Sequence, residues 1–178
     1  MNKKYVFNSK NELLLCGKKF YFLEEIKPIE INKIIDVEKI KYYRDIRKLN
    51  LVKSLLNDGY TTDEVENIKF CKFKLTSNNI DYKSGVYIWV INKEIIYVGE
   101  AKNIKKRFNN GYGTISPRNI FEGGQSTNCK MNRVVLDNYQ KKIKIYFCEY
   151  KEYKKLEKEI LDYLKSNGLD KKLYNSRL

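Results

Sequence analysis

Two short apolar segments followed directly by a basic one constrain this chain more than any other feature. Residues 85–91 and 95–98 are rich in β-branched and aromatic side chains, and Asn92-Lys93-Glu94 lies between them as a turn would. This pattern predicts an antiparallel hairpin. A Lys-rich segment with helical spacing follows over residues 103–109, so a short basic helix is expected directly after the hairpin.

The length of the turn decides where the tyrosines of this hairpin point. Successive side chains lie on opposite faces of a strand, so a register change of one residue moves a side chain to the other face. A three-residue turn would place Trp89 opposite Tyr97 and put Tyr87 and Tyr97 on the same face. A two-residue turn would separate the two tyrosines, and the sequence leaves both registers open.

The rest of the chain mixes strand-like and helix-like patterns, which predicts an α+β protein with a small antiparallel β-sheet flanked by helices. We expect an N-terminal β/α extension over residues 1–80 and a main domain over residues 81–178. The other predicted elements are one or two hairpins within residues 1–30, helices over 36–56 and after 61–63, a strand over 68–75, a helix over 127–139, a strand over 142–150 and a helix over 151–167.

Charge is the second strong constraint on function. The 178 residues carry a formal net charge of +14, which attracts polyanions such as nucleic acid. Residues 102–144 hold ten Lys or Arg against two acids, and the first 80 residues hold sixteen against eleven. No run of 18 apolar residues and no signal-peptide core is present, so we expect a cytoplasmic protein without membrane contact.

Two residue types limit the chemistry further. The chain has no histidine, which excludes Ser-His-Asp hydrolases, nucleases with histidine metal ligands and most zinc enzymes. The four cysteines have no metal-binding spacing and are interpreted as buried or idle thiols of a reducing compartment; they are Cys16, Cys71, Cys129 and Cys148.

One carboxylate is predicted to lie on the core-facing side of a helix, where burying a charge is energetically unfavourable. In the predicted helix 151–167, Glu157 falls between Leu164 and Leu161, inside the apolar stripe that also contains Leu156 and Ile160. A carboxylate on a core-facing side must be paired with a charge or bound to a cation. Two interpretations stay open: a salt bridge to Lys or Arg, and a ligand for Mg²⁺.

One arginine lies beside the buried side of the short basic helix. Ile104 and Phe108 define that side, Arg107 flanks it, and Lys105 and Lys106 point away. The planar guanidinium of arginine suits a phosphate or a developing negative charge. A structural role, as a partner for Glu157 or on a solvated helix face, is the alternative interpretation.

Taken in order along the chain, these features resemble the signature of the GIY-YIG nuclease family. The stretch 97–107 is especially similar to the matching segment of the bacterial excision-repair incision subunit. The interval between the last two signature elements is longer than in the compact form of the family. The five elements of the signature, in chain order, are Gly85-Val86-Tyr87, Tyr97-Val98-Gly99, Arg107, Glu157 and Asn175.

The resemblance implies both an activity and a set of site residues. It implies a phosphodiester hydrolase in which Tyr87, assisted by Tyr97, accepts a proton from the attacking water. Arg107 would stabilise the negative charge of the transition state, and Glu157 would bind a single Mg²⁺ or Mn²⁺ ion. Asn175 would complete the catalytic set as the terminal asparagine of the signature.

An insertion over residues 111–132 is similar to one in restriction enzymes of that family, and it is rich in side chains that can read base edges. An ordinary surface loop would explain its composition as well. The residues expected to contact DNA are Lys102, Lys105, Lys106, Arg118, Asn119, Gln125, Asn128, Lys130, Asn132 and Arg133.

The sequence therefore predicts a metal-dependent endonuclease, most simply a type II restriction enzyme that cuts double-stranded DNA as a homodimer, with a cognate DNA methyltransferase acting separately. The 1–80 segment would grip DNA or form the dimer surface. Alternatives are a repair or homing endonuclease of the same family and a basic nucleic-acid-binding module without activity. A rival nuclease constellation consists of Asp137, Glu149 and Lys151.

Overall fold

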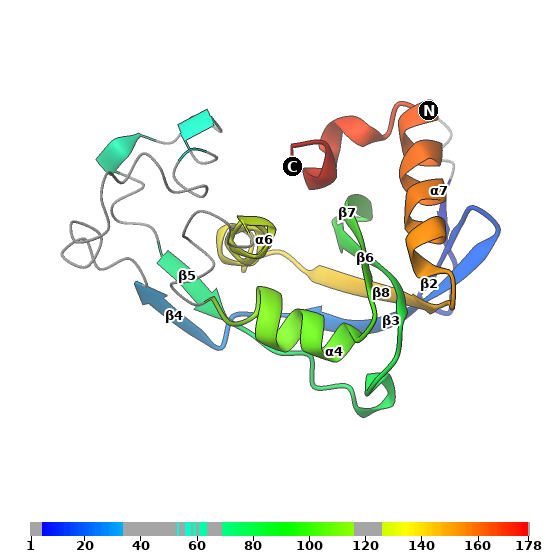
Figure 1. Ribbon diagram of the computed structural model, residues 1–178, viewed down its shortest axis with the longest axis horizontal. Helices are drawn as coiled ribbons and strands as arrows, with labels where there is room; N and C mark the ends of the chain where they lie inside the picture. Colours follow the sequence, from blue (N-terminus) through cyan, green and yellow to red (C-terminus); the bar gives the residue numbers. More distant parts are fainter. Residues whose placement is uncertain are drawn as a thin grey trace. The chain divides into compact units, whose positions relative to one another are not determined.

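The computed structural model describes residues 5–33, 53, 56–57, 59, 61–63, 69–115 and 126–177 (Figure 1). The chain divides into two compact units. The first combines residues 1–26, 75–107 and 140–178, and the second combines residues 27–74 and 108–139. Each unit is therefore assembled from segments that lie far apart in the sequence.

The first unit is built on a six-stranded antiparallel sheet with the strand order β1-β2-β3-β8-β6-β7. This sheet, together with the helices, confirms the predicted α+β class. The strands are β1 (Val6–Phe7), β2 (Glu12–Leu15), β3 (Lys18–Ile26), β8 (Ile143–Glu149), β6 (Gly85–Ile91) and β7 (Glu94–Ala101).

One long helix, α7 (Tyr153–Ser166), packs beside this sheet (Figure 1). Its buried residues Leu156, Ile160 and Leu164 join a core with Val86 and Val98 of the sheet. The apolar stripe that the sequence predicts is thus the packing face of the helix. The shorter helices of this unit are η2 (Asn78–Ile80), α4 (Ile104–Lys106), η4 (Asp170–Lys172) and η5 (Tyr174–Arg177).

The N-terminal strands do not form an extension of their own. β3 pairs with β8, with Tyr21 opposite Phe147, so β1, β2 and β3 continue the sheet that carries the hairpin. The division found after Ile26 differs from the predicted boundary at residue 80. The alternation of a strand reveals that it is half-buried but not which distant strand it pairs with.

The hairpin of β6 and β7 combines features of both predicted registers. Asn92 and Lys93 have φ angles of 51° and 62°, as a two-residue turn of type I′ requires. An irregularity between Trp89 and Val90 then shifts the register by one residue, so that Trp89 lies opposite Tyr97. The shift puts Tyr87 and Tyr97 on the same face, with their ring centroids 6.4 Å apart.

The second unit contains a two-stranded antiparallel sheet of β4 (Glu30–Lys33) and β5 (Lys69–Lys72), on which helix α6 (Ser126–Asp137) packs. A π-helical segment, η3 (Arg107–Tyr112), leads into it. β5 confirms the strand predicted over 68–75. Most of the helix predicted over 36–56 lies outside the described residues.

All four cysteines are free thiols, and burial raises the pKa of Cys71 and of Cys129 to about 12. They therefore pack as apolar side chains. Within the part of the chain that the structure describes, no helix has the length and apolar character needed to cross a membrane.

Candidate active site

Tyr87 occupies a position that only glycine on the next strand permits. The residue opposite it on β7 is Gly99, and a Cβ atom there would lie 2.5 Å from the Tyr87 hydroxyl oxygen. The tyrosine ring therefore lies flat over the backbone of β7, and its exposed fraction is 1%. The two glycine-tyrosine elements of the sequence thus act as one packing unit.

Arg107 reaches this tyrosine from the short helix that follows β7. The helix begins at Asn103, whose side-chain oxygen accepts a hydrogen bond from the backbone N–H of Lys106 at 2.8 Å. The capped turn directs Arg107 to the sheet, where its Nε donates a long hydrogen bond of 3.5 Å to the Tyr87 hydroxyl oxygen. A cation therefore lies next to the phenol that the resemblance assigns as proton acceptor.

Glu157 is held from the other side by α7, where it is half-buried at the edge of the helix packing face. The pKa of this carboxyl is raised to about 7, mainly by burial and also by the nearby Glu100, while Arg107 acts in the opposite direction. Arg107 thus contacts Tyr87 and interacts electrostatically with Glu157. Elements β6, α4 and α7 bring together three of the residues that the sequence singles out.

The two sequence interpretations of Glu157 can now be compared. Among the described residues, Glu157 forms no direct salt bridge with Lys or Arg. Its two charged neighbours are Glu100, which repels it, and Arg107, which offsets that repulsion only in part. A half-buried carboxylate next to a second carboxylate is a site that a divalent cation would stabilise.

Glu100 is a candidate residue that the sequence reasoning missed. It follows the Tyr97-Val98-Gly99 element directly and is half-buried. Strand alternation places it on the same face of β7 as Val98, which packs in the core with α7. The signal that could have revealed it is this alternation, since a carboxylate two residues from a core valine must face the helix that covers it.

The Asn175 side chain binds the backbone of β7, the edge strand of the sheet. Its side-chain oxygen accepts a hydrogen bond from the backbone N–H of Val98 at 2.9 Å, and its side-chain nitrogen donates to the Val98 carbonyl at 2.7 Å. The amide thereby pairs with the outer edge of β7 as another strand would. Because Val98 lies between Tyr97 and Gly99, this clamp positions the strand against which Tyr87 packs.

A metal ion on Glu157 would have to complete its coordination with water and substrate oxygens. Within residues 5–33, 53, 56–57, 59, 61–63, 69–115 and 126–177, no three Cys, Asp or Glu side chains cluster as a ready-made metal cage. A single carboxylate with several water ligands is a common arrangement for Mg²⁺. The residues present therefore fit one open cation position, held by Glu157.

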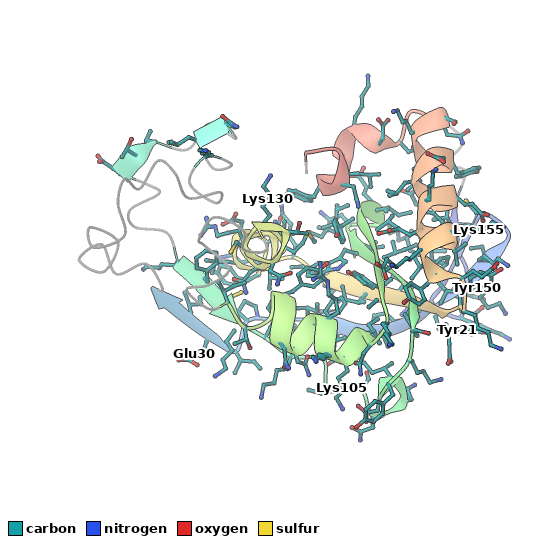
Figure 2. The ribbon with its side chains drawn as sticks, viewed as in Figure 1. Tyr21, Glu30, Lys105, Lys130, Tyr150 and Lys155 are labelled. Carbon is teal, nitrogen blue, oxygen red and sulfur yellow. The ribbon has the colours of Figure 1, made fainter. Side chains whose placement is uncertain are left out.

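The three lysines around Arg107 differ in their availability to DNA. Lys102 and Lys106 are exposed. Lys105, labelled in Figure 2, forms a 2.8 Å ion pair with Asp81 and is less available. The first two are therefore the better candidates for phosphate contacts.

The predicted DNA-reading loop is in part a helix, and two of its asparagines are structural. Asn128 and Asn132 lie on α6 and are buried, with exposed fractions of 1% and 0%. The Asn132 side chain accepts a hydrogen bond from the backbone N–H of Cys71 and donates to the carbonyls of Cys71 and Tyr112. The prediction that these two side chains contact DNA is therefore wrong, because burial removes them from solvent.

The other predicted DNA contacts in this region have different outcomes. Lys130 is partly exposed on α6 (Figure 2) and stays a candidate. Arg133 donates to the carbonyl of Lys69 at 3.1 Å and forms a 2.8 Å ion pair with Asp137. Its guanidinium is therefore engaged by residues of the same unit and is less available to DNA. Arg118, Asn119 and Gln125 lie outside the described residues.

Replacing Asn132 with alanine should therefore lower stability and not DNA affinity. The change leaves the N–H of Cys71 and two carbonyls without their side-chain partner in a buried environment, at an expected cost of about 2–4 kcal/mol in the free energy of unfolding. Urea denaturation would measure it. Lys130→Ala on the same helix is the matched control, and equal stability of the two variants would contradict the structural role.

Both carboxylates of the rival constellation form ion pairs with basic residues. Glu149 forms a 2.7 Å ion pair with Lys83, and Asp137 pairs with Arg133. Asp137 belongs to the second compact unit, whereas Glu149 and Lys151 belong to the first. Both carboxylates already have basic partners, so neither needs a metal ion to offset its charge.

Comparison with known proteins adds no relative. No protein-family model, no curated protein and no solved structure matches this chain. The features that bear on function are therefore the ordered sequence signature and the arrangement of Tyr87, Arg107, Glu100 and Glu157.

Proposed function

We propose that this protein is a metal-dependent DNA endonuclease of the GIY-YIG type. The observation that carries the proposal is the position of Arg107, which contacts the hydroxyl of Tyr87 and interacts electrostatically with Glu157. These residues are separated by up to 70 positions in the sequence, and a histidine-free chain can hydrolyse a phosphodiester with them. The net charge of +14 supports a nucleic-acid substrate.

Each residue then has a chemical role. The Arg107 guanidinium favours the phenolate form of Tyr87 and stabilises the charge that develops on the attacked phosphate. Tyr87 accepts the proton of the attacking water, and Tyr97 supports its ring from the neighbouring strand. Glu157 would hold a divalent cation, which when bound supplies Lewis-acid stabilisation of the leaving oxygen. Because Tyr87 is buried, this role requires a local movement that admits water to its hydroxyl.

The finer assignment concerns the biological task. A restriction endonuclease is the simplest form of the proposal, acting as a homodimer with one site per subunit so that both strands of a palindrome are cut. Double-stranded DNA is the substrate, and Mg²⁺ or Mn²⁺ is the cofactor. Repair or homing cleavage uses the same residues and would differ in where the DNA is cut.

Digestion of a sequenced plasmid with purified protein tests the proposal. In Mg²⁺ we expect discrete fragments whose ends map to one short sequence, and in EDTA we expect intact plasmid. Lys151→Ala should cut as the wild type does, which separates this site from the rival constellation. DNA binding without metal-dependent cleavage would overturn the proposal in favour of a non-catalytic binding module.

A further inference from the structure

A pocket with basic and aromatic lining residues lies in the first unit, apart from the candidate active site. It has a volume of about 350 Å³ and is lined by the loop between β1 and β2, the β6–β7 turn and the start of β8. The β6–β7 turn at Asn92 and Lys93 is at one end of the hairpin, and Gly85 and Ala101, which lead to Arg107, are at the other. The seven residues of β6 span about 20 Å between these ends.

The pocket carries positive charge only. Lys93, Lys142 and Lys144 line it, and none of its lining residues is acidic. Lys93 and Lys142 are exposed, and Lys144 is half-buried. Three lysines around one cavity without an acid favour an anion with several acceptor oxygens, such as a phosphate.

Asn11 presents a fixed donor in the same pocket. Its side-chain oxygen accepts hydrogen bonds from the Tyr146 hydroxyl at 3.0 Å and from the Lys144 ammonium at 3.4 Å. Because an ammonium group can only donate, these contacts fix the orientation of the amide. The backbone N–H of Asn11 donates to the carbonyl of Asn8, whereas its side-chain N–H groups make no hydrogen bond to the described residues and remain as donors for a ligand.

The size and the walls of the pocket indicate more than a bare phosphate. A cavity of about 350 Å³ falls in the range of small-molecule sites and is larger than one phosphate group requires. Phe7 and Tyr146 contribute aromatic walls, with ring centroids 5.5 Å apart. Asn92 adds an amide group, which is suited to the edge of a base, whereas the Asn8 amide is hydrogen-bonded to Lys10 and Glu12.

We propose that this pocket binds a nucleotide, with the lysines and Asn11 holding its phosphate. The proposal does not depend on catalysis at Arg107 and Glu157. A nucleotide can reach the pocket as a free monophosphate or as a unit of a DNA strand, and both present the same chemistry. The affinity for the two forms distinguishes the sources.

Calorimetric titration of the full chain tests this proposal. The probes are a deoxynucleoside 5′-monophosphate, the matching nucleoside, and a single-stranded oligonucleotide of the same base, all in EDTA. We expect the monophosphate to bind and the nucleoside to bind at least tenfold more weakly. Tighter binding of the oligonucleotide would assign the pocket to a strand, and equal binding would assign it to a free nucleotide.

Variants locate the binding. Asn11→Asp keeps the oxygen that Tyr146 and Lys144 contact but adds a negative charge, and should weaken monophosphate binding at least tenfold. The double variant Lys93→Ala/Lys142→Ala, which changes only exposed side chains, should do the same.

The control is Lys10→Ala/Lys171→Ala, which removes two exposed lysines outside the pocket. Equal affinity of the pocket and control double variants would overturn the proposal, as would equal binding of nucleoside and monophosphate. Because the binding is measured in EDTA and without cleavage, its failure would leave the proposed endonuclease activity untouched.

Discussion

Arg107→Ala should lower the rate of DNA cleavage by about 10²–10³-fold or more, the usual cost of removing a group that stabilises transition-state charge. The guanidinium is next to the Tyr87 hydroxyl and is the cation that offsets the repulsion between Glu157 and Glu100. Its removal weakens both the activation of the phenol and the stabilisation of the phosphate. Single-turnover cleavage with the enzyme in excess over DNA would measure this loss without contributions from product release.

The matched control is Lys106→Ala, which removes an adjacent but exposed cation. This variant should bind DNA more weakly, with a shallower salt dependence, and cut bound DNA at the wild-type rate. Tyr87→Phe, which removes one buried hydroxyl oxygen, should lose cleavage by several orders of magnitude and keep its DNA affinity. If Arg107→Ala loses affinity and stability in proportion to rate, Arg107 has a structural role and the catalytic assignment fails.

The hairpin that carries this site shows what local sequence can predict. The strands β6 and β7 and the turn at Asn92 follow from β-branched content and turn chemistry. The register does not, because the irregularity after Trp89 depends on packing across the whole sheet. The local sequence alone therefore does not determine that both tyrosines lie on one face.

Long-range pairing and burial explain the other differences. The N-terminal strands could be recognised, but their partner β8 lies more than 100 residues away. The residue pattern of a strand does not identify the strand with which it pairs. Asn128 and Asn132 have side chains that can read DNA, and nothing in their local sequence reveals that α6 turns them into the core. Amphipathic spacing did locate Glu157, whereas its neighbour Glu100 became evident only when α7 was placed against β7.

Glu157→Gln should make the metal-free protein more stable above pH 7. Burial and Glu100 raise the pKa of Glu157 from its ordinary value of 4.5 to about 7, so the folded state favours the protonated carboxyl. That stabilisation is complete below pH 4.5 and is lost as the pH rises through 7. Above pH 7 the ionised carboxylate destabilises the folded state. Glutamine cannot ionise, so at pH 8 the variant should gain roughly 1–2 kcal/mol, allowing for solvent screening of a half-exposed group.

The same carboxylate should make stability respond to metal. Mg²⁺ that binds only the folded protein should raise the melting temperature of the wild type at pH 8. It should leave Glu157→Gln unchanged, and this variant should also lose cleavage. Glu159→Gln, an exposed position on the same helix, is the control and should follow the wild type in both EDTA and Mg²⁺. An equal Mg²⁺ response in Glu157→Gln and the wild type would place the cation elsewhere, because a ligand stabilises the folded state only through the groups that bind it.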